Sequence, residues 1–461
     1  MLIELWSLRV IQIDVEALDI IERDSVELEN EKHLRAILSI GPELEERQYF
    51  SVRVKGGRYS ITAGKYIGVI PISQDLVLHV RSKVPTVRLV EILSIARESP
   101  ILIRLLERQY MPGRDLDILE LLILALHGAL PPLLEHGPIR QYQRAHEIGQ
   151  AMRGRPSFSE TVTQLWPRAA FDKAAYEFYE FSPNNYLNKA MEYTLWHVNR
   201  VLPQVSSTLD KHLMQDFHDA HRMFAGVDPD RTRTFLPELR RHLQARVTHE
   251  PYAAFRPLLS ICRMILDDLG VDLDAEAIDP VALVPMVIDM ETVFQRFLLN
   301  IITEQAKEVG GLACWDTATE QQATLFRDPT LPVPHEFLQI TSHEPAKPDF
   351  TLALGGTPIL IGDAKYKTHR NVDDVYQAVS HAAAYGVQDV LLVYPSTNRA
   401  KTVAFTSLGN VGDVRVFVCA FPLDTEDLES AAHELFSGIC RIIEIRHPGA
   451  TTVSSLQLGQ A

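Results

Sequence analysis

The sequence predicts a multidomain α+β protein, because the hydrophobic pattern changes twice along its 461 residues. Residues 1–110 alternate as strands do and are expected to form a β-rich N-terminal domain. Residues 111–279 are mainly of helical period and form a helical middle region. Residues 280–447 combine helices with apolar strands in an α/β domain, and the tail 448–461 is expected to be disordered.

The N-terminal domain is expected to contain short strands joined by tight turns. Tyr49–Lys55 and Arg58–Ala63 flank Gly56-Gly57, a pair typical of a hairpin turn. Residues 75–81 alternate with a period of two, which predicts a half-buried strand. Helical periodicity begins near Val87.

The middle region is expected to be helical apart from residues 137–156, whose mixed pattern predicts loops. Leu187–Val198 has the apolar spacing of an amphipathic helix. The apolar segment Leu116–Leu134 contains charged residues and two prolines, so it predicts a buried helix rather than a membrane span.

The C-terminal domain is expected to begin with a helix and to continue with several apolar strands. The predicted helices are 283–307, 373–386 and 426–444, and the predicted strands are 312–316, 336–341, 349–354, 358–365, 389–394 and 414–420.

The composition is that of an ordinary globular protein, with 46% hydrophobic and 23% charged residues. The four cysteines are far apart and form no Cys-x-x-Cys pair, which favours free thiols in a reducing cytosol. They are Cys262, Cys314, Cys419 and Cys440. Because no basic stretch followed by a long apolar run opens the sequence, no signal peptide is expected, and a cytoplasmic location follows.

The net charge of −15 argues against a protein that grips DNA unaided, since neutralising phosphates requires Lys and Arg. It leaves room for a nuclease that a partner loads onto DNA. The sequence also lacks a G-x-x-x-x-G-K-[ST] pattern, so the chain is not expected to bind GTP through a phosphate loop.

Two predicted strands around Gly355-Gly356 carry the residues best suited to chemistry. Asp349 begins the first strand, and Asp363 and Lys365 end the second. Residues two apart in a strand point the same way, so Asp363 and Lys365 are expected to share a face. The second strand is otherwise apolar. Placing two charged residues at its end costs free energy unless the charges are paired or bind a metal ion.

Hydrolysis of a phosphodiester explains why these residue types would occur together. A hard cation offsets charge on the phosphate and acidifies a water molecule, and Mg²⁺ prefers oxygen ligands such as carboxylates. A neighbouring lysine can orient or deprotonate the attacking water and stabilise developing negative charge. The predicted helix after the second strand places Gln377 to reach back toward the end of that strand.

This arrangement resembles the PD-(D/E)xK nuclease superfamily, whose core is helix–strand–strand–strand–helix–strand. Asp363-Ala-Lys-Tyr-Lys followed by Asp374-Val-Tyr-Gln is similar to the McrC-type subunit of 5-methylcytosine restriction systems. Four other segments resemble the same family: Tyr59–Ile70, His136–Tyr142, Met152–Phe158 and Leu187–Leu195.

The resemblance implies a DNA endonuclease subunit that works with a partner. McrC-type proteins pair with a hexameric McrB-type AAA+ GTPase that reads modified double-stranded DNA, and no membrane is involved. Their N-terminal region docks on the ring and stimulates nucleotide hydrolysis. The implied cofactor is Mg²⁺, with Mn²⁺ as a possible substitute. The implied catalytic residues are Asp349, Asp363, Lys365 and Gln377, and the implied metal-binding residues are Asp349, Asp363 and Ala364.

The first helix of the C-terminal domain departs from the family pattern. That helix usually has an acidic residue after a phenylalanine, whereas this chain has Phe294-Gln295. Glu291 lies four residues earlier on the same helix face and is a candidate for the additional catalytic carboxylate, although none may be needed.

Structural alternatives stand beside these site assignments. Asp349, Asp363 and Lys365 could form a surface ion-pair cluster at strand ends. Tyr376 is expected to be mostly core, and His381 to be structural or solvent-facing. Lys367 could touch phosphate or be solvated, and the basic residues Arg231, Arg240 and Arg241 are expected on a solvated helical face rather than at DNA.

Three functional hypotheses remain. The first is a Mg²⁺-dependent nuclease subunit working with an AAA+ GTPase. The second is a non-catalytic adaptor that activates and anchors the ring, which the loss of an acidic residue at Gln295 favours. The third is a stand-alone nuclease, which the acidic net charge and the long non-nuclease N-terminal part disfavour.

Overall fold

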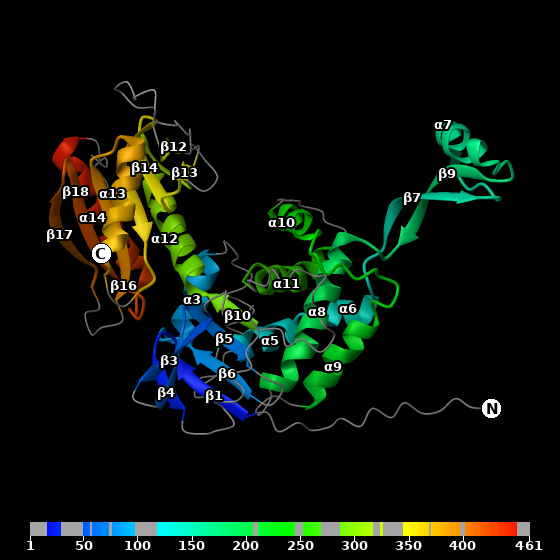
Figure 1. Ribbon diagram of the computed structural model, residues 1–461, viewed down its shortest axis with the longest axis horizontal. Coiled ribbons are helices and arrows are strands. Elements are labelled where there is room, and N and C mark those ends of the chain that lie inside the picture. The colour runs from blue at the N-terminus through cyan, green and yellow to red at the C-terminus, as the bar shows by residue number, and fades with distance from the viewer. Residues whose placement is uncertain are drawn as a thin grey trace, which may run out of the picture. The chain divides into compact units, whose positions relative to one another are not determined.

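The computed structural model in Figure 1 describes twelve stretches of the chain: 16–28, 49–55, 58–72, 76–96, 118–205, 211–244, 252–268, 286–316, 323–325, 344–367, 370–396 and 402–449. They divide into two compact units. One holds the described parts of Val69–Leu78 and Arg104–Val287. The other holds those of Leu18–Gly68, His79–Ile103 and Ile288–Ala461, so it combines N-terminal and C-terminal segments.

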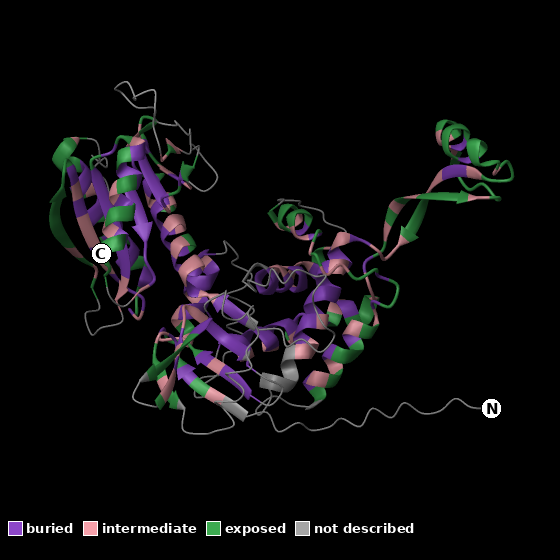
Figure 2. Ribbon diagram, viewed as in Figure 1, coloured by how far each residue is buried: buried purple, intermediate pink, exposed green. Residues whose placement is uncertain are grey.

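A six-stranded mixed sheet is the centre of the second unit. Its strand order is β11 (Leu312–Trp315), β14 (Phe350–Leu354), β15 (Thr357–Ala364), β16 (Asp389–Ser396), β18 (Val414–Pro422) and β17 (Ala404–Val411). β15, β16 and β18 run parallel, whereas the other neighbours are antiparallel. β15 and β16 are mostly buried, as apolar strands covered on both faces are expected to be, and β18 is a mixture of buried and half-buried residues (Figure 2).

A tight turn joins β14 to β15 at Gly355-Gly356, as the sequence predicts. Both glycines have positive φ, 56° and 86°, the conformation that a two-residue hairpin turn requires and that glycine adopts at low cost. The hairpin brings Phe350 opposite Gly362. A Cβ added to Gly362 would lie 1.9 Å from the Phe350 ring, so only glycine allows this ring to lie against the strand.

Three helices cover the two faces of the sheet. On one face, α13 (Val372–Tyr385) packs on β15, β16 and β18 through a core that includes Ile361, Ala378 and Val390. On the other face, α12 (Met290–Ala306) contacts β15 and α14 (Leu428–Arg446), which in turn contacts β18 (Figure 1). The end of β15 therefore lies between α12 and α13.

N-terminal strands and a helix complete the second unit. β2 (Ser25–Leu28), β4 (Arg58–Ala63) and β3 (Phe50–Lys55) form an antiparallel sheet in that order. Helix α3 (Thr86–Ala96) packs along α12, and Asn300 of α12 donates a 2.8 Å hydrogen bond to the carbonyl of Ile95. A further sheet, whose residues are divided between the two units, has the order β1 (Glu16–Ile21), β6 (Leu76–Arg81), β5 (Tyr66–Pro71) and β10 (Met286–Asp289).

The first unit is mainly helical, as the sequence predicts. Its helices are α5 (Ile118–Gly128), α6 (Pro131–His136), α8 (Tyr186–Val205), α9 (Lys211–Arg222), α10 (Leu236–Gln244) and α11 (Arg256–Asp268). By length and composition the stretch Ile118–His136 could cross a membrane, but more than half of it is buried against other parts of the protein. All four cysteines are free thiols.

The expectation of loops at 137–156 is wrong, because β7 (Gln141–Gly149) pairs with β9 (Ala174–Ser182) over nine residue pairs. β9 also pairs with β8 (Arg155–Pro156), and α7 (Phe158–Glu160) follows. Figure 1 shows this arm extending from the helices of its own unit. β7 is almost wholly solvated, so its sequence lacks the apolar alternation that marks a half-buried strand.

Other boundaries also differ from the sequence-based expectations. The helix predicted from residue 283 begins at Met290, because Asp289 caps it by accepting hydrogen bonds from the main-chain N–H groups of Glu291 and Thr292. Met286–Asp289 is strand β10 instead. β17 is missing from the predicted strands because it is a largely exposed edge strand. The predicted strand 336–341, the turn at Gly56-Gly57 and the tail from residue 450 lie outside the described residues.

Arg231 also differs from expectation. It belongs to a turn, not to a solvated helical face. Its guanidinium donates two 2.8 Å hydrogen bonds to Glu192, a buried carboxylate, and lies 4.2 Å from the centre of the Trp196 ring. A buried carboxylate needs such a partner, so Arg231 has a structural role. Arg240 and Arg241 are exposed on α10, as expected.

Candidate active site

The end of β15 presents Asp363 and Lys365 toward α13. Ile361, two residues earlier, lies in the core beneath α13, and the alternation of a strand directs Asp363 and Lys365 to the same side. The expectation that the two share a face is confirmed, since Lys365 Nζ lies 3.9 Å from Asp363 Oδ2. Both are buried, with 1% of Asp363 and 8% of Lys365 exposed, so a surface ion-pair cluster is excluded.

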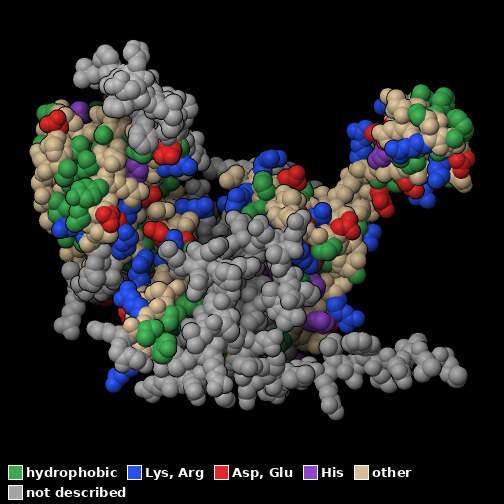
Figure 3. Space-filling view, in the orientation of Figure 1, with side chains coloured by type: hydrophobic (Ala, Val, Ile, Leu, Met, Phe, Trp, Pro, Cys, Tyr) green, Lys and Arg blue, Asp and Glu red, His purple; other side chains and the backbone are tan. Residues whose placement is uncertain are grey.

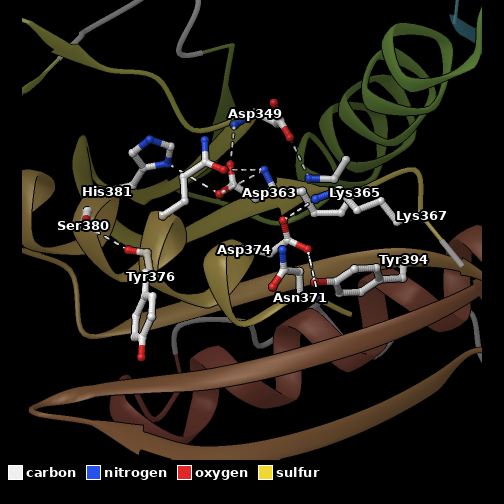
Figure 4. Close-up of polar contacts among 12 residues, drawn as sticks. Asp349, Asp363, Lys365, Lys367, Asn371, Asp374, Tyr376, Ser380, His381 and Tyr394 are labelled. Atoms are coloured by element: carbon white, nitrogen blue, oxygen red, sulfur yellow. Dashed lines mark hydrogen bonds and ion pairs between the residues drawn. The ribbon is translucent and has the colours of Figure 1, made fainter. Parts of the chain in front are cut away.

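Asp349 lies beside Asp363 because the β14–β15 pairing brings the start of one strand to the end of the other. The Asp349 N–H donates to Asp363 Oδ1 over 3.3 Å, and Asp349 Oδ2 accepts from the Ala364 N–H over 2.7 Å. Figure 4 shows these groups converging. The hairpin therefore places two carboxyl groups side by side.

Gln377 completes the cluster from the second turn of α13. Its Oε1 accepts a 2.9 Å hydrogen bond from Lys365 Nζ, which confirms that Gln377 reaches back to the end of the strand. The bond holds the ammonium group beside the two carboxyl groups and fixes its direction.

The carboxyl groups of Asp349 and Asp363 have unusual electrostatic surroundings. Burial, followed by the charge of Asp363, raises the pKa of Asp349 to about 7. In addition, Asp363 Oδ2 is buried and accepts no hydrogen bond from the described part of the chain. A half-buried and a buried carboxyl group side by side, with one oxygen unpaired, favour either a shared proton or a bound cation.

This donor set suits a cation that takes few protein ligands. Among the described residues, no group of three or more His, Cys, Asp or Glu side chains is arranged to hold a metal ion. Mg²⁺ commonly binds through one or two carboxylates and keeps several waters, so Asp349 and Asp363 fit it. Ala364 could contribute only its main-chain oxygen, since its side chain is a methyl group without a ligand atom.

We expect the stability of the metal-free protein to fall as the pH rises. The folded-state pKa of Asp349, about 7, is above its ordinary value of 3.8, so its contribution to stability is complete below pH 3.8 and lost as the pH passes 7. The Tm should drop by on the order of 5 °C between pH 5 and pH 8, and Asp349→Asn should flatten this dependence. An unchanged pH dependence in Asp349→Asn would show that another group is responsible.

Glu291 lies near this cluster but is bound elsewhere. Its carboxylate contacts the ammonium of Lys65, which also lies 3.2 Å from Asp289 Oδ2. No hydrogen bond joins Glu291 to Asp349 or Asp363, although its charge contributes to raising the pKa of Asp349. Gln295, one turn later in α12, is half-buried. Glu291 is therefore held by the β4–β5 turn.

The N-terminus of α13 fixes the segment that follows Lys365. Asp374 is buried, and it accepts hydrogen bonds from Lys367 Nζ at 2.6 Å and from the Tyr394 hydroxyl at 3.1 Å. Asn371 and Asp374 form a capping box at the start of the helix. Burial raises the pKa of Asp374, but the hydrogen bond and charge of Lys367, together with hydrogen bonds from Tyr394 and the Asn371 N–H, outweigh it, and the net pKa is lowered. Lys367 is thus partly exposed but ion-paired with Asp374.

Tyr366 anchors the same segment on the opposite side, and sequence reasoning did not identify its partner. Its hydroxyl donates a 2.8 Å hydrogen bond to Glu22, a buried carboxylate that also accepts from the Lys83 N–H at 2.9 Å. The Tyr366 ring packs on Phe294 of α12. Because 344 residues separate Glu22 from Tyr366, no local pattern could have joined them.

Tyr376 of α13 differs from expectation, since it was expected to be mostly core and is 60% exposed. For His381, the solvent-facing alternative is excluded and the structural one is left, because the side chain is buried, with Nδ1 3.5 Å from Asp363 Oδ2. The helix is turned so that the face carrying Gln377 and His381 meets the end of β15 (Figure 4).

Comparison with known proteins agrees with this fold. Residues 61–395, more than two thirds of the chain, match the family model described as McrBC 5-methylcytosine restriction system component. No curated protein matches the chain.

Among solved structures, the chain is similar to one in a refined half-complex from a tetradecameric assembly of Thermococcus gammatolerans McrB AAA+ hexamers with bound McrC. The identity is 16%, the TM-score is 0.50, and the match covers 93% of this chain and 100% of the other, which shows a shared fold. A second similarity, to the Thermococcus gammatolerans McrBC complex, has 18% identity, covers 62% and 87%, and at a TM-score of 0.39 supports no further inference. From its family match, this chain belongs to the McrBC 5-methylcytosine restriction system component family.

Proposed function

We propose that the chain is the DNA endonuclease subunit of a modification-dependent restriction system, with a PD-(D/E)xK site formed by Asp349, Asp363 and Lys365. The observation that carries this proposal is the half-buried carboxyl group of Asp349 beside the buried Asp363 and Lys365 at the end of a central strand. In support, α12, β11, β14, β15, α13 and β16 follow the superfamily's helix–strand–strand–strand–helix–strand order.

Each residue has a role that its contacts support. Mg²⁺, when bound by Asp349 and Asp363, would offset charge on the phosphate and acidify a water molecule. The Asp349 carboxyl is held by the Ala364 N–H, so it keeps one orientation toward Asp363. Lys365, held by Gln377, directs its ammonium group to where negative charge develops during cleavage.

The net charge of −15 is consistent with a subunit that is delivered to DNA. We propose a McrB-type AAA+ GTPase hexamer as the partner that recognises the modified DNA. Membership of the McrBC family and the likeness to a structure containing McrB hexamers with bound McrC support this partner.

The arm formed by β7, β8, β9 and α7 is the surface we propose for this partner. Figure 3 shows hydrophobic side chains gathered over its tip, beside Lys and Arg. Large exposed apolar patches rimmed by charge are typical of protein interfaces. The exposed hydrophobic residues of the arm are Tyr142, Ile148, Met152, Phe158, Val162, Trp166, Phe171, Tyr179 and Phe181.

Replacing Phe158 and Phe171 together with serine is expected to reduce stimulation of the partner's GTP hydrolysis at least tenfold. The two side chains are 74% and 71% exposed, so their loss removes interface area without affecting the folded core. Val54→Ser on β3, where the side chain is 63% exposed, is the matched control. If Val54→Ser reduced stimulation and the double variant did not, docking would lie in the N-terminal strands.

A plasmid cleavage assay tests the proposed function. Methylated and unmethylated plasmids are incubated with the chain and the AAA+ protein encoded beside it, with GTP and Mg²⁺. Cleavage should require both proteins, nucleotide and modified DNA, and it should be lost in Asp363→Ala and Lys365→Ala while complex formation persists. Cleavage that survives both substitutions would exclude this site.

A non-catalytic adaptor is the second candidate function. Gln295 in place of an acidic residue and the ion pair between Glu291 and Lys65 favour it, because neither residue then supplies a third carboxylate. Mn²⁺ titration separates the two functions. Binding that is lost in Asp363→Asn supports the nuclease, whereas no binding, with GTP hydrolysis still stimulated, supports the adaptor.

A further inference from the structure

His381 and Asp363 present two buried polar atoms to each other across the end of β15. Nδ1 of His381 lies 3.5 Å from Oδ2 of Asp363, and within the described residues neither atom makes a hydrogen bond. His381 is 7% exposed and Asp363 1% exposed, so bulk water does not readily compensate them. Leaving a buried donor or acceptor unpaired destabilises the folded state, so each atom needs the other or a ligand.

The two oxygens of Asp363 are held differently. Oδ1 accepts from the Asp349 N–H at 3.3 Å, whereas among the described residues Oδ2 is approached by Lys365 Nζ at 3.9 Å and His381 Nδ1 at 3.5 Å. Lys365 Nζ already donates to Gln377, which draws it away from Oδ2. His381 is thus the nearest available donor that could set the plane of this carboxylate. Figure 4 shows its ring directed at Asp363 from α13.

We propose that His381 is a positioning residue whose Nδ1–H donates to Asp363 Oδ2 and fixes this carboxylate for cation binding. The inference rests on the proposed function, because it assigns a role within the same site. Donors behind a ligating carboxylate hold it in its binding orientation, and losing them typically weakens metal affinity about 10- to 100-fold. His381 itself touches neither DNA nor the reacting phosphate in this role.

The four-residue spacing of Gln377 and His381 explains why one helix can contact both Lys365 and Asp363. Residues four apart lie on the same face of a helix. Gln377 accordingly receives Lys365, and His381 faces Asp363 one turn later. α13 therefore supplies an acceptor for the lysine and a donor for the aspartate.

Asparagine and glutamine at position 381 give a geometric test. The amide nitrogen of asparagine stands where Nδ1 stands, whereas that of glutamine corresponds to Nε2. Both variants remain polar and of similar size. His381→Asn should therefore retain the hydrogen bond to Asp363, and His381→Gln should lose it.

The experiment titrates Mn²⁺ into the full-length chain by calorimetry and follows plasmid cleavage with the AAA+ partner over a range of Mn²⁺ concentrations. His381→Gln is expected to weaken Mn²⁺ binding about 10- to 100-fold and to shift the cleavage curve by the same factor, whereas His381→Asn stays within about threefold of wild type. His433→Gln, an exposed histidine of α14, is the matched control and should change neither curve.

Equal Mn²⁺ affinity in His381→Gln, His381→Asn and wild type would overturn the positioning role while leaving the proposed nuclease intact. Equal loss in both variants would also overturn it, since a structural or directly ligating histidine would not distinguish the two amides. If the wild-type chain binds no Mn²⁺ and cuts no DNA, the proposed function itself fails, and the role of His381 fails with it.

Discussion

Asp363→Asn is expected to abolish DNA cleavage and, at the same time, to stabilise the metal-free protein. Asparagine keeps the shape of aspartate and can still accept the Asp349 N–H, but it carries no charge for a cation. Cleavage should fall on the order of 1000-fold or more. Stability at pH 8 should rise by about 1 kcal/mol, because a buried charge beside Asp349 is removed.

The stability gain expected for Asp363→Asn depends on whether the burial of the charge and its repulsion of Asp349 outweigh its attraction to Lys365. The attraction to Lys365 is weakened by a distance of 3.9 Å, and Oδ2 accepts no hydrogen bond from any described residue. The burial of the charge and its repulsion of Asp349 are therefore expected to outweigh the lost attraction. Thermal unfolding with and without Mn²⁺ measures the balance. A Tm below that of wild type in metal-free buffer would show that the ion pair dominates instead.

Asp389→Asn is the matched control, because Asp389 is an equally buried carboxylate on the neighbouring strand β16. It is bound by Arg415 at 2.6 and 2.8 Å and by Arg446 at 3.1 Å. The same substitution should here lower stability by about 2 kcal/mol and leave cleavage at permissive temperature unchanged. A loss of stability in Asp389→Asn and a gain in Asp363→Asn would distinguish a structural carboxylate from one that binds a cation.

Gly362→Ala is expected to destabilise the second unit by about 3 kcal/mol or more, despite adding a single methyl group. The added Cβ would lie 1.9–2.4 Å from three atoms of the Phe350 ring. Phe350 is fully buried, so its ring has no free space to enter. The strand would have to move where it carries Asp363, and both unfolding and cleavage should report the change.

Gly310→Ala is the control for this substitution, since nothing lies within 4 Å of a Cβ added there. It should leave the unfolding midpoint and the cleavage rate as in wild type. The double variant Phe350→Leu, Gly362→Ala should recover part of the stability by removing the ring. If Gly362→Ala alone unfolds as wild type does, the close packing of Phe350 on β15 is not required.

The sequence by itself determined the parts of the site that depend on near neighbours. Asp363 and Lys365 share a face because strand residues alternate, and the Gly355-Gly356 turn sets the hairpin that pairs Asp349 with Asp363. Gln377 reaches Lys365 because a helix follows the strand directly. Local periodicity and turn chemistry suffice for these relations.

Only the tertiary structure decided the contacts that arise from helix rotation and from distant segments. Whether His381 or Tyr376 faces Asp363 depends on how α13 packs on the sheet, and that packing buries the histidine and exposes the tyrosine. Glu22 meets Tyr366, and Lys65 holds Glu291, across hundreds of residues. Strand β7 of the solvated arm and the edge strand β17 do not bury a face. Their sequences therefore show no apolar alternation, and no pattern in the sequence predicts them.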